Sequence, residues 1–320
     1  MQFKMIGLVG ATGFVGHHLA CELARRGYRM RVLARRRERH RELLVYPTLE
    51  LVETDVHQVS DLSARLAGCD AVINLAGILN ETRHPNESFQ SVHVELPRKV
   101  AEACASNRIT RLLHMSALNA SPEAPSAYLR SKGEGERVVE RAAHEGLQLT
   151  IFRPSVIFGR DDGFFNRFAA LLRLSPLFFP LACPGARFAP VCVDDVVAAF
   201  AGSLADKKTF GKRYELCGPR VYTLAELVQY TARVIGVHRR IIPLGEGLSR
   251  LQARILERVP GKPFSLDNFL SMQVDSVCAE NGLAALGITP ASVEGRVPLY
   301  LAQHGRGQLY QRLRGRVREV

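Results

Sequence analysis

Residues 5–16 read Met-Ile-Gly-Leu-Val-Gly-Ala-Thr-Gly-Phe-Val-Gly. The apolar run at 5–9 predicts a buried strand, and the glycines after it open a helical pattern. Glycines at this point let the backbone turn tightly and approach a pyrophosphate, whose charge the amides of the helix N-terminus bind. The stretch therefore predicts a dinucleotide-binding turn; a glycine-rich helix start used only for packing is the alternative. The residues expected to line the nucleotide here are Gly10, Thr12, Gly13, Phe14, Val15 and Gly16.

Outward from this turn, short β-branched runs alternate with longer amphipathic stretches, which is typical of a parallel sheet with crossover helices. We expect strands at residues 5–9, 29–34, 51–53, 71–75, 111–115 and 148–153. We expect helices at residues 14–26, 60–67, 89–106 and 126–144. Six strands in this rhythm predict an α/β fold, a Rossmann-type doubly wound parallel sheet.

The pattern changes after Pro154. Residues 160–190 are rich in Phe, Leu and Pro, as in an insertion over a site, and the chain after Thr223 is mostly helical in pattern. We therefore predict a nucleotide-binding Rossmann domain at 1–160 that returns at about 187–220. Residues 161–186 and 221–320 would form a smaller, mostly helical C-terminal domain on the substrate side, ending in a basic tail.

The positive charge of the chain is concentrated in two segments. Of a formal net charge of +12 over 320 residues, residues 25–41 contribute nine arginines and one acid, and residues 305–320 five arginines and one acid. The chain has no tryptophan, and neither segment interleaves its arginines with aromatic residues, so we expect no nucleic-acid partner. The tail at 298–320 could form a basic amphipathic end that contacts a membrane or a membrane complex, or a disordered surface tail.

The seven cysteines are scattered and contain no Cys-x-x-Cys pair, so we expect reduced thiols and no metal site. The most apolar later stretch, at 164–183, is interrupted by two arginines and two prolines and cannot supply a membrane span. These features favour a cytoplasmic protein, peripheral at most to the inner face of the membrane.

The end of the second predicted strand carries arginines where an acid would be expected for NAD. An acid there usually binds the adenosine ribose hydroxyls, whereas arginine favours the 2′-phosphate of NADP. Arg35 and Arg36 are the candidates for this phosphate, so NADP(H) is the preferred cofactor and NAD(H) the alternative. Asp55 and Val56, after the third strand, would lie near the adenine, although Asp55 could equally be a turn residue.

Tyr128 and Lys132 lie four residues apart, on one face of the helix after the fifth strand. A tyrosine is a poor acid–base catalyst at neutral pH, and a nearby lysine cation lowers its pKa. Ser116, at the end of the fifth strand, would donate a hydrogen bond to the substrate, or it could face the sheet edge and leave Ala117 toward the substrate. The candidate catalytic residues are therefore Tyr128, Lys132 and Ser116.

These motifs together resemble the short-chain dehydrogenase/reductase superfamily, in its extended and atypical branches of the epimerase/dehydratase type. The resemblance covers residues 4–240 and implies an NADP(H)-binding Rossmann domain. Its motifs are the glycine turn, Asn74-Leu75-Ala76-Gly77, the Tyr128 and Lys132 pair, Arg153-Pro154-Ser155-Val156-Ile157-Phe158-Gly159, and Val191-Cys192-Val193-Asp194-Asp195-Val196. The cofactor-binding residues that it adds are Leu75, Ala76, Gly77, Lys132, Pro154 and Val156.

Within the superfamily, the sequence at 113–118 and 128–132 is most similar to that of the nucleotide-binding accessory subunit of respiratory complex I and its bacterial relatives. In the mitochondrial subunit the nucleotide is thought to be structural. This chain departs from the superfamily at His93, where an asparagine is common. His93 could still bind the neighbouring strand, although a lone histidine is more often a core residue.

Two functions follow from these expectations. The first is an oxidoreductase or epimerase that moves hydride between NADP(H) and a carbonyl or alcohol, with Tyr128 as acid/base and Lys132 as its partner. Its small-molecule substrate would be a nucleotide sugar or a quinone- or isoprenoid-like compound. The second is a non-catalytic assembly or sensor protein that NADPH stabilises. The phenylalanines at 164–188 would roof an apolar substrate site or pack a core.

Overall fold

The computed structural model describes residues 3–82, 84–144, 146–259 and 262–302. Within these ranges the chain forms two compact units. Unit 1 contains residues 3–154, 194–216 and 278–289, and unit 2 contains residues 155–193, 217–277 and 290–302. The basic segment at 305–320, predicted to contact a membrane or a membrane complex, lies outside the described residues.

Unit 1 is built on a seven-stranded sheet in which every strand pairing is parallel. The strand order is β11-β6-β5-β4-β1-β2-β3. The strands are β1 (Met5–Val9), β2 (Arg29–Ala34), β3 (Leu49–Glu53), β4 (Ala71–Asn74), β5 (Arg111–Met115), β6 (Gln148–Pro154) and β11 (Lys212–Leu216). The chain builds outward from β1 in one direction and then from β4 in the other, so the order reverses between these two strands. The predicted doubly wound sheet is confirmed, and the reversal marks where ligands bind in such folds.

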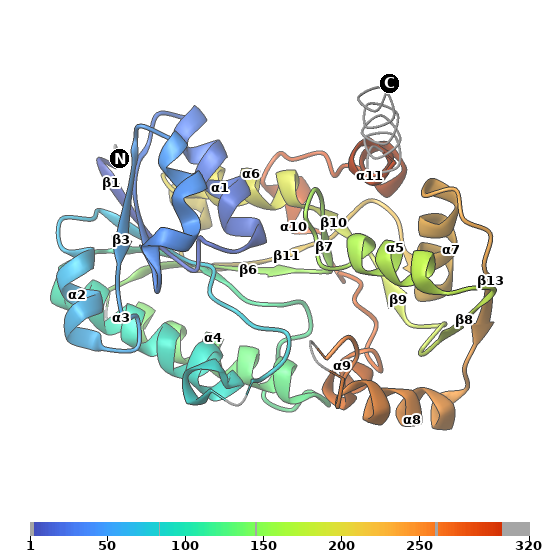
Figure 1. Cartoon of the computed structure of the whole chain (residues 1–320). Coiled ribbons are helices and arrows are strands. Elements are labelled where there is room, and N and C mark those ends of the chain that lie inside the picture. The colour runs from blue at the N-terminus through green and yellow to red at the C-terminus, as the bar shows by residue number, and fades with distance from the viewer. Residues whose placement is uncertain (1–2, 83, 145, 260–261, 303–320) are drawn as a thin grey trace, which may run out of the picture. The chain divides into compact units, whose positions relative to one another are not determined.

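Helices cover both faces of this sheet, with α2, α3 and α4 on one face and α1 and α6 on the other (Figure 1). Their bounds are α1 (Phe14–Arg25), α2 (Val59–Leu66), α3 (Leu96–Ser106), α4 (Ala127–His144), α6 (Val193–Ser203) and the short α10 (Gly282–Ala285). Strands enclosed on both faces are largely apolar, and all four residues of β4 are buried. Leu62, Leu66, Val100 and Leu112 are fully enclosed where α2 and α3 pack on the sheet.

The helix predicted at 89–106 is two elements. A π-helical turn, η3 (Gln90–Glu95), precedes α3, and Pro97 lies in the first turn of α3. Proline has no N–H, so the carbonyl of His93, four residues earlier, loses its usual helical donor, and the turn widens. Gly135 of α4 packs against this carbonyl so closely that a Cβ at position 135 would lie 2.0 Å from it. The backbones of the two elements can meet because position 135 has no side chain.

Unit 2 consists of short strands and helices around a separate core. The pairs β7 with β10 and β8 with β13 are parallel, whereas β9 with β12 is antiparallel. The strands are β7 (Ile157–Phe158), β8 (Phe178–Leu181), β9 (Arg187–Phe188), β10 (Val191–Cys192), β12 (Tyr222–Thr223) and β13 (Arg240–Pro243). The helices are α5 (Phe165–Leu174), α7 (Leu224–Val234), α8 (Glu246–Leu256), α9 (Leu266–Ser271) and α11 (Val293–Leu301).

The core of unit 2 takes up much of the phenylalanine-rich segment. Phe158, Phe165, Phe179 and Phe188 are buried in it, against α5, α7 and α11. Tyr300 of α11 is also buried there, and its hydroxyl donates to the Asp162 carboxylate at 2.7 Å. For these phenylalanines, core packing is therefore the interpretation that the contacts support.

One expectation about the cysteines is wrong. Cys217 and Cys278 are each in a disulfide bond, whereas Cys69 and Cys104 are buried free thiols. Neither oxidised residue lies in a local cysteine motif, so the sequence alone did not indicate a disulfide. None of the helices in the described ranges combines the length and the apolar character needed to span a membrane.

Candidate functional site

The glycine turn connects β1 to α1 and brings the backbone close to the next strand. Gly10 has φ of +78°, a conformation that side chains disfavour, and a Cβ there would lie 2.6 Å from the amide nitrogen of Ala76. Gly16 faces the turn itself, where a Cβ would lie 2.3 Å from the Ala11 Cα. Gly13 is the N-cap of α1 and makes no side-chain cap. The first amides of α1 are thus presented at a surface without side chains, as an anion site requires.

A cavity of about 760 Å³ opens at this turn. It lies entirely in unit 1, at the carboxyl ends of β1, β2 and β4, where the strand order reverses. From the set predicted to bind cofactor, the structure brings together Gly10, Thr12, Gly13, Phe14, Val15, Gly16, Arg35, Arg36, Asp55, Val56, Leu75, Ala76 and Gly77 along its walls. Its size and its place in the fold suit a dinucleotide.

The arginines after β2 have different partners. Arg35 is held by Glu87, with 2.7 Å between its Nη1 and the Glu87 Oε1, and this guanidinium lowers the pKa of the Glu87 carboxyl. Arg36 lines the cavity, as do Arg39 and His40 of the 3₁₀ helix η1 (Arg37–Val45). Within the described ranges, Arg36 and Arg39 form no ion pair. Arg39 was not among the residues predicted to bind cofactor, and the structure adds it to the cavity wall.

Asp55 both lines the cavity and closes a turn. Its carboxylate accepts from the backbone N–H of His57 at 3.0 Å and from the side-chain amide of Gln58 at 3.1 Å. The adjacent Val56 is buried. The two alternatives weighed for Asp55, a position by the adenine and a turn acid, are therefore compatible.

Lys132 is buried beside the far end of this cavity. Its side chain is 4% exposed, and its Nζ donates to the Met115 carbonyl at 3.2 Å. A Cβ at Gly77 would lie 3.0 Å from the same Nζ, so the ammonium touches two residues that line the cavity. Burial lowers the pKa of Lys132 to about 8, and the Glu136 carboxylate partly opposes this. The ammonium therefore stays mostly charged at neutral pH.

Tyr128 lies one helical turn before Lys132 and is half-buried. Its ring packs edge-on against Phe89, with 5.9 Å between ring centroids, and against His93, with 5.5 Å. Two aromatic neighbours restrict the rotation of the ring, and the shared helix face keeps the phenol and the ammonium on the same side of α4.

His93 joins the loop after β4 to α4. The backbone N–H of Ile78 donates to its Nε2 at 3.0 Å, so Nδ1 carries the proton and donates to the Ser131 hydroxyl at 2.9 Å. That hydroxyl donates in turn to the Tyr128 carbonyl at 2.8 Å. Burial and the nearby Lys132 cation lower the pKa of His93 to about 2, so the ring is neutral. The sequence favours a core residue at His93, and the structure shows that this buried ring also fixes the helix carrying Tyr128.

Ser116 is not among the residues that line the cavity. The residue is 3% exposed, and its hydroxyl has no hydrogen-bond partner within the described ranges. Its backbone N–H donates to the Phe152 carbonyl, and Ala117 follows it. The structure therefore does not bring Ser116 together with the other predicted residues. Pro154 and Val156 are also absent from the cavity wall, and Val156 packs against the core of unit 2.

His17, His40 and Glu42 offer nitrogen and oxygen atoms that all lie within 4.8 Å of one another, so this group could hold a metal ion. The Glu42 Oε1 lies 3.5 Å from both His17 Nε2 and His40 Nδ1. The three side chains are partly exposed, and contacts between one carboxylate and two imidazoles are common at protein surfaces without a metal ion.

Comparison with known families and structures bears on this geometry. A family model described as NAD dependent epimerase/dehydratase family matches residues 6–216. The chain is 31% identical to "NADH dehydrogenase [ubiquinone] 1 alpha subcomplex subunit 9, mitochondrial" of Arabidopsis thaliana, over 93% of this chain and 77% of that protein. It is 30% identical to "Ceramide reductase" of Caulobacter vibrioides, over 75% of this chain and 73% of that protein.

Among solved structures, a crystal structure of the Escherichia coli NADPH-dependent quinone oxidoreductase QOR2 with NADPH superposes with a TM-score of 0.72. The sequence identity is 17%, and the match covers 95% of this chain and the whole of that one. At this identity the likeness concerns the fold, and it agrees with the seven-stranded sheet of unit 1.

Proposed function

The chain belongs to the NAD dependent epimerase/dehydratase family, and from that premise we propose that it is an NADP(H)-dependent oxidoreductase acting on a carbonyl or alcohol. The observation that carries the proposal is the placement of Lys132. This cation is buried against Gly77 and Met115 of the cavity wall, one turn from Tyr128 on the same helix. A buried ammonium beside a nucleotide cavity is costly to fold, and a catalytic role accounts for its retention.

In this proposal Tyr128 exchanges a proton with the substrate oxygen. A phenol with an ordinary pKa near 10 needs a neighbouring cation to act at neutral pH, and Lys132 supplies that charge. Bound NADPH would supply the hydride. His93 is a positioning residue, because its two hydrogen bonds hold Ile78 and, through Ser131, the first turn of α4.

The preference for NADP(H) over NAD(H) is supported by the charges after β2. Arg36 and Arg39 line the cavity, and neither has an acidic partner within the described ranges, so both are available to a phosphate. Arg35 also lines the cavity, but its guanidinium binds Glu87. We therefore assign the 2′-phosphate chiefly to Arg36 and Arg39, with Arg35 ordering the wall beside them.

For the substrate we propose a carbonyl compound with a large apolar portion. The support comes from the Caulobacter vibrioides relative, whose name is that of a ceramide reductase. A quinone- or isoprenoid-like compound shares this character, whereas a nucleotide sugar does not. The apolar part of such a substrate has no hydrogen-bonding needs of its own and contributes to binding by burial.

A second function is favoured by the position of Ser116. Its hydroxyl is enclosed and does not reach the cavity, and the next residue, Ala117, has no hydroxyl. A short hydrogen bond to the substrate oxygen is then lacking from this strand end. A protein that keeps NADPH as a stabilising ligand without turning it over would need none, and the Arabidopsis relative carries the name of a subunit of a larger enzyme.

The deciding experiment is to purify the protein gently, identify the nucleotide that co-purifies, and follow NADPH oxidation with long-chain ketones, quinones and nucleotide sugars. We expect NADPH to be bound and to be oxidised by an apolar carbonyl compound. Tyr128→Phe should abolish turnover with unchanged NADPH affinity, and Tyr28→Phe, elsewhere in unit 1, should have no effect. Bound NADPH that no carbonyl oxidises, together with full biological activity of Tyr128→Phe, would establish the second function instead.

A further inference from the structure

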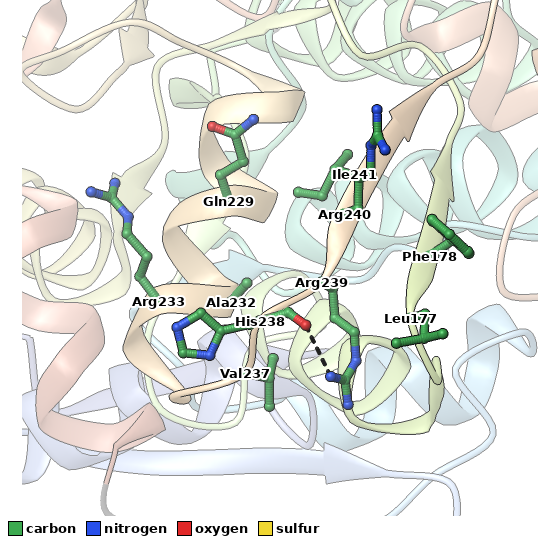
Figure 2. A pocket seen from close by; sticks show the side chains of 10 residues that line it. All are labelled: Leu177, Phe178, Gln229, Ala232, Arg233, Val237, His238, Arg239, Arg240 and Ile241. Atoms are coloured by element: carbon green, nitrogen blue, oxygen red, sulfur yellow. Dashed lines mark hydrogen bonds between the residues drawn. The ribbon is translucent and has the colours of Figure 1, made fainter.

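Unit 2 has a cavity of its own, of about 700 Å³, that the nucleotide chemistry does not use. It lies between α7, the start of β13 and the start of β8 (Figure 2). All of its walls come from unit 2. The cavity can therefore be examined independently of unit 1.

Among the described residues that line this cavity, none is acidic. The lining includes the guanidinium groups of Arg233, Arg239 and Arg240 and the imidazole of His238. Figure 2 shows them at separate points around the opening rather than converging on one spot. Within the described ranges, none of the three arginines forms an ion pair. Arg239 is instead anchored by the carbonyls of Leu172 and His238, at 3.1 and 3.0 Å.

The rim of the cavity is apolar on the side of β8. Leu177 is 67% exposed and Phe178 is 52% exposed, and Leu174, at the end of α5, is 81% exposed. Contiguous apolar surface often marks an interaction site, so these side chains, beside arginines that have no acidic partner in the described ranges, favour a binding partner. That partner must offer negative charge and an apolar phase next to each other.

We propose that this face of unit 2 docks on a membrane surface that contains anionic phospholipids. The arginines would bind the phosphate groups of several lipids, which agrees with their separate positions, and Leu177 and Phe178 would enter the acyl region beneath the headgroups. A single small phosphorylated ligand would be bound better by converging cations. The proposal concerns unit 2 and is independent of the function proposed for unit 1.

The test uses the full chain and vesicles of phosphatidylcholine with or without phosphatidylglycerol, with binding measured by flotation. Arg233→Gln/Arg240→Gln should weaken binding to the anionic vesicles about 30-fold, since each arginine near an anionic surface contributes about fivefold. Lys207→Gln/Lys208→Gln removes the same charge from exposed positions in unit 1 and should change binding little. Equal losses in the two double variants would overturn the proposal, because general attraction to the whole chain would then explain the binding.

Insertion can be observed directly because the chain contains no tryptophan. Phe178→Trp places one fluorescent reporter at the rim, and Tyr28→Trp places one in unit 1. Anionic vesicles should shift the emission of the first variant to shorter wavelength and leave that of the second unchanged. A Phe178→Trp emission that ignores vesicles, or that shifts with protein concentration alone as it would if a second copy covered this face, rejects the membrane assignment.

Discussion

Because the Lys132 ammonium is buried, we predict that removing its charge raises the stability of the protein and abolishes its activity. Burial lowers the pKa of this lysine from 10.5 to about 8 in the folded protein. The folded state therefore binds this proton less tightly than the unfolded state does. Burial of this ammonium therefore lowers the free energy of unfolding. The loss is present in full below pH 8 and disappears as the pH rises from about 8 to 10.5. Its full size is about 3 kcal/mol, and roughly half of it remains at about pH 9.5.

Lys132→Met removes the charge and keeps much of the side-chain volume. It also removes the donor to the Met115 carbonyl, which costs about 1 kcal/mol at any pH. The variant should therefore exceed the wild type by about 2 kcal/mol in free energy of unfolding at pH 7, and this advantage should fall by about 2 kcal/mol at about pH 9.5. Turnover of NADPH should be lost in the variant.

The assay is urea unfolding of both proteins at the two pH values. Lys99→Met is the matched control, because Lys99 also donates to a backbone carbonyl, that of His57 at 2.9 Å, from a less buried position. The change in free energy of unfolding caused by Lys99→Met is subtracted from that caused by Lys132→Met. The difference measures the contribution of burying the charge. An advantage of Lys132→Met that is the same at both pH values would refute the argument that burial holds this ammonium at a cost.

Three further changes test other parts of unit 1. Arg36→Ala/Arg39→Ala should weaken NADPH binding about 100-fold, because two charged hydrogen bonds of about 1.5 kcal/mol each would be lost, and should leave NADH binding unchanged. Calorimetric titrations measure both affinities. Equal losses of affinity for the two nucleotides would show that these arginines do not bind the 2′-phosphate. Arg153→Met should cost about 2 kcal/mol in urea unfolding, since Glu136, only 2% exposed, would lose its bidentate partner and keep Arg213 at 3.2 Å. Arg153→Met/Glu136→Leu should recover part of that loss. Gly135→Ala should lower the free energy of unfolding by about 3 kcal/mol or prevent folding, because its Cβ would meet the His93 carbonyl; unchanged thermal unfolding would contradict this.

The sequence predicted the sheet and the nucleotide cavity because their signals are local. A glycine turn between a buried strand and a helix fixes the backbone over a few residues, and strand ends in a parallel sheet converge on one edge. Residues as distant as Gly10, Arg36 and Gly77 could therefore be assigned to one cavity before any distance was known. The position of Lys132 followed in the same way, from its spacing to Tyr128 on a helix.

Two other features, the orientation of Ser116 and the role of His93, have no comparable local signal. Whether Ser116 or its neighbour faces the cavity depends on where the fifth strand stops, and a shift of one residue reverses the direction of a side chain. The role of His93 depends on Pro97, which widens the turn before α3, and on hydrogen bonds to Ile78 and Ser131 that no local pattern encodes. Such contacts between segments distant in the chain become visible only in the folded structure.

The basic segment at 25–41 shows why net charge along the chain predicts partners poorly. Five of its nine arginines are in ion pairs, among them Arg31 with Glu50 at 2.8 Å and Arg35 with Glu87. What remains available at the cavity is chiefly Arg36, with Arg39 beside it. Under the proposed function, this strongly basic segment would supply the site for a single phosphate group.

The cavity of unit 2 is the opposite case, in which a neutral stretch of sequence forms a cationic surface in the fold. The chain outside the two basic segments is neutral overall, so composition gave no reason to look for a cationic surface there. Arg233, Arg239 and Arg240 are balanced in the sequence by acids, but none of the acids that the structure describes forms an ion pair with them. Charge that is cancelled in a sum can still be unpaired in space, and an attraction between charges depends on their distance rather than on their order in the chain. Cations without an acidic partner in the described structure therefore identify such a surface. The exposed Phe178 beside them indicates a binding partner that also has an apolar phase.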